Sequence, residues 1–320
     1  NLMLPTHNLI KPADGTPITV PNKEMALGCY YLTTIDPQYA DMAPEKMPVF
    51  DKSEGILAYQ SGKISLRHPI RLFLNKELLV STVGRILFNE LLPVEIQYFN
   101  TPVKAATIKQ LVTQVLENYS EEESVKLIDA IKDFGFWGAT LSGGGSVSVF
   151  DNTMIEGKDD MIHEAEGKVT EVDQNFQQGL ITLEEKKRLS NEIWIETTEK
   201  IADLTWDNLA PTNPVKIIIE SGGARASKDQ LKQLAAMRGL VVDPLGKIVE
   251  LPTKSNFRQG LSIFEYVTTT RGSRKGLTDS ALKTADAGYL TRRLVDVTHD
   301  VIIRLDDCGT DNSIEINKNA

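Results

Sequence analysis

The sequence predicts a mainly helical α+β protein of several parts, with a projecting antiparallel helical hairpin and one long helix near its C-terminus. Three observations support this prediction. Apolar residues recur at helical spacings over residues 162–204, a helical pattern persists over residues 263–300, and the first third mixes proline-rich loops with short β-type runs. A chain of 320 residues is long enough for more than one hydrophobic core. We expect three regions, at residues 1–150, 151–252 and 253–320.

The first region combines extended and helical segments. Prolines break its opening residues into extended pieces, and residues 70–74 are typical of a strand. A helical pattern covers residues 103–118 and restarts after Ser120, which forms the pattern of a capping box with Glu123. We expect Gly135 to end this second helix, and the glycine-rich stretch behind it to lead into a short strand.

Residues 162–204 have the pattern of an antiparallel helical hairpin. Apolar residues of the first arm are spaced by three and four, residues 177–179 interrupt them, and a second arm begins at Thr182. Arms of this length extend about 22 to 35 Å at about 1.5 Å per residue. The alternative is a helix pair packed inside a bundle. The apolar stripe comprises Ile162, Ala165, Val169, Val172 and Phe176, then Leu189, Ile193, Thr197, Ile201 and Leu204.

Residues 217–240 suggest an anion-binding turn. Their first three residues are typical of a strand, Gly222 and Gly223 of a turn, and the residues from Ser227 of a helix. Free N–H groups and the helix dipole at such a helix start attract a phosphate, and Arg225 adds a forked donor. A purely structural turn is the alternative, because the segment lacks a phosphate-loop motif.

Residues 263–300 would form a helix of about 55 Å if they were continuous. Gly272, Gly276 and Gly288 each cost about 1 kcal/mol relative to alanine, so two or three short helices are the alternative. Small residues also let a ligand approach a helix closely, and a cationic rim suits nucleic acid. This interpretation rests on Thr284, Ala285 and Gly288, flanked by Lys283, Arg292 and Arg293.

The charge distribution and the cysteine content indicate the kinds of partner and the cellular compartment. The net charge is −9, yet residues 254–304 hold nine Lys and Arg against five Asp and Glu, whereas residues 117–173 hold four against fourteen. The basic segment suits nucleic acid, and the acidic segment suits a basic protein partner. Only two cysteines occur, far apart, and no apolar run reaches the ~20 residues of a membrane span. We expect a cytoplasmic protein, cut from a longer chain because no signal pattern or initiator Met begins it.

Several segments, in order, resemble the β′ subunit family of bacterial DNA-directed RNA polymerase. The long helix resembles the bridge helix over FRQGLSIFEYVTTTRGSRKGLTDSALKTADAGYLTRRLVDVTHD. The hairpin is similar to the one at the rim of the secondary channel over EAEGKVTEVDQNFQQGLITLEEKKRLSNEIW. The earlier segments NLIKPADGTPITVPNKEMALGCYYLT, TVGRILFNELLP and LIDAIKDFGFWGAT resemble the residues after the catalytic aspartate loop and the pore. Residues 34–81 match poorly.

The resemblance implies transcription of DNA into RNA by nucleotidyl transfer, with the RNA 3′-hydroxyl attacking an NTP α-phosphate and two Mg²⁺ ions assisting. It implies Zn²⁺ in the full subunit, and as partners the β and α subunits, template DNA, nascent RNA, NTPs and secondary-channel regulatory factors. The metal-binding aspartates are expected upstream of this chain. We therefore expect the chain alone to be inactive.

The resemblance also implies roles for single residues. Two departures affect them: Arg271 replaces the usual histidine, and ESGGARAS carries an extra glycine and an alanine where SGARGS is usual. Arg225 and Lys23 match residues near the NTP phosphates, and Cys308 matches one of four zinc ligands, the other three being absent. The bridge-helix surface against the nascent base pair is matched by Thr284, Ala285, Gly288 and Tyr289. The expected regulator-docking site is the hairpin tip, with Gln177, Gln178 and Leu180.

Two other functions remain open from the sequence. The first is a non-catalytic helical scaffold or a degenerate relic of the subunit, whose glycine turns are merely structural. The second is an independent phosphate-binding enzyme built around Arg225. An aspartate loop upstream and clustered cysteines downstream in the gene would favour the polymerase.

Overall fold

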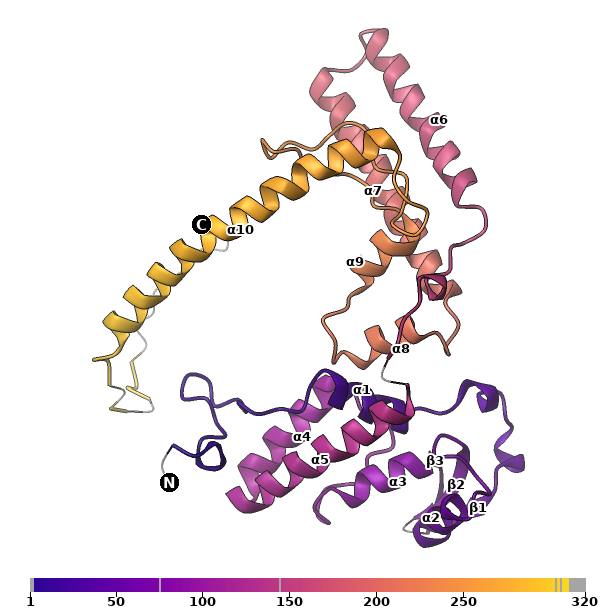
Figure 1. Ribbon diagram of the computed structural model, residues 1–320, viewed down its shortest axis with the longest axis vertical. Coiled ribbons are helices and arrows are strands. Elements are labelled where there is room, and N and C mark those ends of the chain that lie inside the picture. The colour runs from indigo at the N-terminus through magenta and orange to yellow at the C-terminus, as the bar shows by residue number, and fades with distance from the viewer. Residues whose placement is uncertain (1–2, 75, 144, 303, 306, 311–320) are drawn as a thin grey trace. The chain divides into compact units, whose positions relative to one another are not determined.

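The computed structural model is mainly helical with one three-stranded sheet, which confirms the predicted fold class (Figure 1). It forms two compact units, which are described separately. The first holds the residues up to Leu240 together with Glu250–Ser262, and the second holds Val241–Val249 and the residues from Ile263 onward. The structure describes residues 3–74, 76–143, 145–302, 304–305 and 307–310.

The main core of the first unit lies where helix α1 (Glu24–Thr33) crosses helix α5 (Glu121–Leu141). A Cβ at Gly28 would lie 1.8 Å from the carbonyl oxygen of Gly135, and one at Gly135 would lie 2.4 Å from that of Met25. Glycine is needed here because the two backbones touch. The prediction that Gly135 ends its helix was wrong: α5 continues past it, since its glycines serve the crossing rather than a helix end.

Three further α-helices and the sheet complete this core. The sheet has the order β1-β2-β3, with β1 and β2 parallel and β2 and β3 antiparallel. The predicted strand at 70–74 and the helix at 103–118 are confirmed, and Ser120 and Glu123 form the predicted capping box. The elements are η1 (Pro5–His7), η2 (Pro37–Tyr39), η3 (Pro44–Lys46), β1 (Val49–Phe50), α2 (Lys52–Gln60), β2 (Pro69–Leu74), β3 (Glu77–Thr82), α3 (Val83–Glu90) and α4 (Ala105–Asn118).

Two local predictions in this region were wrong. The segment behind α5 forms a short 3-10 helix, η4 (Val149–Asp151), rather than a strand, and Ser148 caps it. Helix α1 occupies a stretch that the sequence suggested to be loops and β-type runs. Its residues are nearly all buried, so the two-sided packing that stabilises the helix hides its amphipathic signal.

A buried cation joins α1 and α3. The side chain of Arg85 is 6% exposed, and its Nε donates to the carbonyl oxygen of Thr33 at 2.8 Å. Its Nη1 donates to the backbone oxygen of Asn100 at 2.9 Å. Thr33 is the last residue of α1, so the guanidinium satisfies a carbonyl at the negative end of that helix. Burial lowers the pKa of Arg85.

The predicted hairpin is formed by α6 (Lys158–Gln177) and α7 (Leu183–Asn208), which pack side by side (Figure 1). At its base, Ile162 and Trp194 are buried against Met237. The predicted stripe is only partly right, because Leu204 is 45% exposed. The line of α7 that is buried comprises Trp194, Thr198, Ile201 and Thr205.

The segment predicted as strand, turn and helix is helical before the turn as well. Residues 217–219 lie in α8 (Pro214–Ser221), which starts at an Asn213 cap and ends at Gly222 with φ +66°. Behind the turn, α9 (Lys228–Leu231) continues as a π-helical turn, η5 (Lys232–Ala236). The predicted strand was wrong and the predicted helix from Ser227 is confirmed.

A buried amide closes that π-helical turn. Asn256 is fully buried, and its Nδ2 donates to the carbonyl oxygens of Ala235 at 2.8 Å and Ala236 at 3.1 Å. Its Oδ1 accepts from the N–H of Gln259 at 2.8 Å. The widened turn leaves these carbonyls without helical partners, so the Asn256 side chain satisfies them.

The second unit contains α10 (Ile263–Thr298), one continuous helix as predicted (Figure 1). A Cβ at Gly272 would lie 2.7 Å from the carbonyl oxygen of Val242, whereas those at Gly276 and Gly288 would meet nothing within 4 Å. Close approach of the 241–249 segment therefore requires glycine only at Gly272. No helix in the described part of the chain has the length and apolar character that crossing a membrane would demand.

Candidate functional site

The two residues predicted to contact phosphate lie on segments that touch. The backbone N–H of Lys23 donates to the carbonyl oxygen of Gly223 at 3.1 Å. A Cβ at Gly223 would lie 2.7 Å from the carbonyl oxygen of Lys23 and 2.7 Å from the Cβ of Ala26. Only glycine lets the turn that carries Arg225 lie this close to the start of α1.

Both side chains are available to a ligand. Lys23 and Arg225 are exposed, and neither side chain makes a hydrogen bond or ion pair with any other described residue. Two cations from distant parts of the sequence thus flank one junction. Their role at phosphates stays a prediction, but the structure brings their segments together.

The backbone of Lys23 is strained. Its φ of 52° and ψ of −121°, together with the hydrogen bond from Met25 N–H to Asn22 O at 3.1 Å, place it at the second position of a type II′ turn. That position normally takes glycine, so a lysine there costs on the order of 1 to 3 kcal/mol. Such strain persists where the surroundings hold the residue, and it is common at binding sites.

The structure changes the physical basis that we predicted for anion binding. Because α8 precedes the turn, the negative carbonyl end of a helix, rather than a strand, meets Gly222. At the start of α9, the N–H of Ser227 already donates to Gln230 Oε1 at 3.2 Å. That N–H is therefore not free to bind a phosphate, and the cationic side chains are the other groups that the prediction named.

A polar contact missed by the sequence reasoning ties α8 to α1. The Tyr30 hydroxyl donates to Glu220 Oε2 at 2.7 Å. Burial and the adjacent carboxylate both raise the pKa of Tyr30, so the phenol stays protonated as a donor. The contact occupies the Glu220 carboxylate, the acidic group that lies nearest in sequence before the glycine turn. No sequence pattern indicated this pairing.

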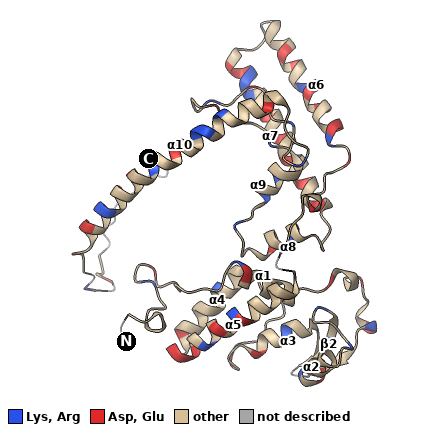
Figure 2. Ribbon diagram, viewed as in Figure 1, with Lys and Arg blue, Asp and Glu red and all other residues tan. Residues whose placement is uncertain are grey.

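The predicted nucleic-acid surface lies on one face and flank of α10. Thr284, Ala285, Gly288 and Tyr289 are all exposed within the second unit, and no atom would lie within 4 Å of a Cβ at Gly288. The Arg293 guanidinium lies 4.4 Å from the Tyr289 ring centroid. Figure 2 shows Lys and Arg distributed along this helix. Its other predicted members are Lys283, which is exposed, and Arg292, whose Nε lies 3.9 Å from Asp296 Oδ2.

The hairpin tip is exposed and locally ordered by hydrogen bonds. Gln177, Gln178 and Leu180 are exposed, and Leu180 N–H donates to the carbonyl oxygen of Asn175 at 3.0 Å. Gly179 has φ +75°, which turns the chain toward α7.

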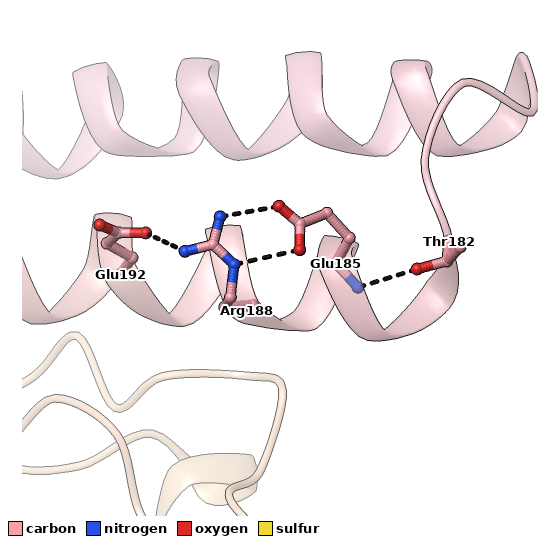
Figure 3. Close-up of polar contacts among 4 residues, drawn as sticks. All are labelled: Thr182, Glu185, Arg188 and Glu192. Carbon is pink, nitrogen blue, oxygen red and sulfur yellow. Dashed lines mark hydrogen bonds and ion pairs between the residues drawn. The ribbon is translucent and has the colours of Figure 1, made fainter.

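A polar chain stabilises the start of the return helix. Thr182 Oγ accepts from Glu185 N–H at 3.3 Å, Arg188 bonds both Glu185 oxygens at 2.7 and 3.0 Å, and its Nη1 donates to Glu192 at 3.0 Å (Figure 3). The tip therefore has a defined shape.

The described residues do not fit a metal centre. Cys308 is exposed, whereas Cys29 is buried in the core, where burial raises the pKa of its thiol to about 12. Within the described ranges, no three His, Cys, Asp or Glu side chains gather as metal ligands. Tetrahedral zinc needs four ligands, so Cys308 provides at most one of a set.

Three family models match the chain in order. They are described as RNA polymerase Rpb1 domain 3 over residues 8–152, domain 4 over residues 163–258 and domain 5 over residues 260–320.

Relatives cover nearly the whole chain. It is 43% identical over 316 residues to the DNA-directed RNA polymerase subunit β′ of Desulforudis audaxviator, 41% over 317 residues to that of Thermosipho africanus and 41% over 330 residues to that of a Nocardioides species. Each comparison covers 98% of this chain and, respectively, 27%, 19% and 25% of the relative. With three successive domains and nearly its entire length matched, the chain belongs to the β′ subunit family of DNA-directed RNA polymerases.

Proposed function

We propose that this chain is part of the catalytic subunit of a DNA-directed RNA polymerase and that it supplies contacts to the NTP triphosphate, the bridge helix and part of the secondary-channel wall. The observation that carries the proposal is the junction of the Lys23 and Gly223 backbones, which brings together the segments of two cations that have no ion-pair partner among the described residues. Family membership supplies the reaction: an RNA 3′-hydroxyl attacks an NTP α-phosphate, and pyrophosphate leaves.

In this proposal the chain acts through position and charge. Lys23 and Arg225 hold the phosphates of the incoming nucleotide and offset their negative charge. The guanidinium of Arg225 offers paired donors, whereas the ammonium of Lys23 acts as a point charge. The exposed row with Thr284, Ala285 and Gly288 lies against the nascent base pair, because small side chains permit close approach.

The test is replacement of Arg225 by alanine in the full-length subunit, assembled into polymerase. We expect kcat/KM for NTP incorporation to fall at least about tenfold, as loss of a charge-assisted contact implies. Arg225→Lys should recover part of it, because charge returns without the fork. Arg188→Ala, at an exposed arginine of α7, is the matched control. Unchanged kcat/KM in Arg225→Ala would refute the proposal.

Further parts of the proposal follow from the family. The full polymerase would contain β and α subunits, template DNA and nascent RNA, would use Mg²⁺ and Zn²⁺, and would be cytoplasmic. Since the described residues hold no ligand set for either metal, we assign no chemical step through a metal to this chain. The scaffold and the independent enzyme are not favoured, because all three domain matches are to RNA polymerase.

We also propose that the hairpin tip binds regulators that enter the secondary channel. Its support is the exposed, hydrogen-bonded turn, in which Leu180 is 68% exposed. Alanine at Gln177, Gln178 and Leu180 together should weaken binding of such a factor to assembled polymerase about tenfold or more, because an exposed apolar anchor is lost. Factor-free transcription should not change. Gln110→Ala on α4 is the control, and unaltered factor binding by the triple variant would reject this docking site.

A further inference from the structure

A third lysine lies at the junction of the two predicted phosphate contacts. Lys104 immediately precedes α4 and is exposed. Its neighbour Ala105 lies beside the glycine turn, since a Cβ at Gly222 would lie 3.9 Å from the Cβ of Ala105. Gly222 therefore adjoins the start of α4 while Gly223 contacts the start of α1. The turn that carries Arg225 meets two helix starts, and each begins after a lysine.

Both helices begin with an N-cap residue that is unfavourable for helix stability. Lys23 and Lys104 occupy the N-cap positions of α1 and α4, and neither helix has a side-chain cap. Ser, Thr, Asp and Asn are the preferred N-cap residues because their oxygens accept from free N–H groups. A lysine lacks that oxygen, and its charge is repelled by the positive helix end. Two such lysines at one junction are unfavourable unless an anion joins them.

The charges at the junction are not neutralised within the described chain. Like Lys23 and Arg225, Lys104 has no side-chain hydrogen bond or ion pair to a described residue. Of the acidic residues close by in sequence, Glu220 accepts the Tyr30 hydroxyl, and Glu24 and Asp229 are exposed. Cations gathered on adjoining segments repel one another, and a polyanion would offset that repulsion.

We propose that Lys104 is a third contact, with Lys23 and Arg225, for a chain of two or three phosphates. The proposal rests on the function proposed above and adds a residue to it. Two sources have this chemistry: the triphosphate of an entering NTP and the pyrophosphate that leaves. Lys104 binds the phosphate chain by charge and does not take part in bond making or breaking.

The test uses Lys104→Ser in the full-length subunit of assembled polymerase. Serine is a preferred N-cap, so this variant should keep or raise the thermal midpoint of unfolding while removing the charge. We expect KM for NTP to rise about threefold to tenfold with kcat within about twofold, and the rise to shrink at high salt because exposed charges are screened. Lys104→Arg should restore KM. A merely structural role would move neither KM nor its salt dependence.

A second arm separates the two sources. KM for pyrophosphate is measured in the reverse reaction, pyrophosphorolysis, with the same variants. A rise in the NTP arm alone assigns Lys104 to the entering nucleotide, a rise in the pyrophosphate arm alone assigns it to the leaving group, and a rise in both assigns it to each. Lys126→Ala, which removes an exposed lysine on α5, should leave both values unchanged.

The parallel Arg225→Ala variant keeps the two proposals distinguishable. If Arg225→Ala lowers kcat/KM but Lys104→Ser changes neither the KM for NTP nor the KM for pyrophosphate, the role of Lys104 is refuted and the proposed function stands. If Arg225→Ala has no effect, the proposed function itself fails.

Discussion

Replacing Gly28 by alanine is expected to separate α1 from α5 and to unfold the first unit's core. The added methyl would lie 1.8 Å from the Gly135 carbonyl oxygen and 2.5 Å from the Ala139 nitrogen. Both are backbone atoms of a helix and cannot turn aside as a side chain can. Overpacking commonly costs 1 to 3 kcal/mol, so a clash with rigid backbone should cost more than about 3 kcal/mol.

The two cysteine thiols of the chain can report this change. Cys29 is fully buried beside Gly28, while Cys308 is exposed. In the purified chain, a thiol reagent should label Cys308 at once and Cys29 only when the core opens. We expect Gly28→Ala to label both thiols rapidly and to unfold at a much lower temperature.

A glycine in another helix supplies the control for Gly28→Ala. Gly167 lies inside α6, and a Cβ there would meet no atom within 4 Å. Gly167→Ala should therefore stabilise the chain by about 0.5 to 1 kcal/mol. If the Cys29 thiol were labelled as slowly in Gly28→Ala as in the wild type, the close crossing of α1 and α5 would be contradicted.

Replacing Arg85 by leucine is expected to lower the free energy of unfolding by about 3 kcal/mol or more. The change removes the donors that satisfy the carbonyl oxygens of buried Thr33 and half-buried Asn100, and a buried acceptor left unpaired costs about 1 to 3 kcal/mol. Arg85→Lys should cost less, because it keeps a cation at the end of α1 but cannot reach both oxygens in fork geometry.

Urea unfolding of the purified chain, followed by far-UV circular dichroism, measures this effect. Arg188→Leu on α7 is the control, since Arg188 is exposed and its ion pairs with Glu185 and Glu192 are worth at most about 1 kcal/mol. A shift in Arg85→Leu no larger than in Arg188→Leu would show that the buried contacts contribute little.

Local sequence patterns correctly predicted those elements that are specified by their own residues. The apolar residues spaced by three and four predicted the hairpin, and the Ser120 and Glu123 pattern predicted a helix start that the structure confirms. The errors occur where a residue serves a distant contact. Gly135 resembled a helix end because glycine disfavours helices, yet α1 requires it. The isoleucines of α8 have high β propensity, yet the Asn213 cap and Pro214 start a helix there.

The sequence by itself determined the family of this chain, the hairpin and the long helix, because these depend on local periodicity and on ordered motifs. Only the tertiary structure decided that the segments carrying Lys23, Lys104 and Arg225 meet at one junction. Their meeting depends on two glycines of one turn: Gly223, which lies too close to the start of α1 for a side chain, and Gly222, whose φ of +66° turns the chain beside the start of α4. No local pattern encodes such an approach, because it is a property of three segments that are distant in the chain.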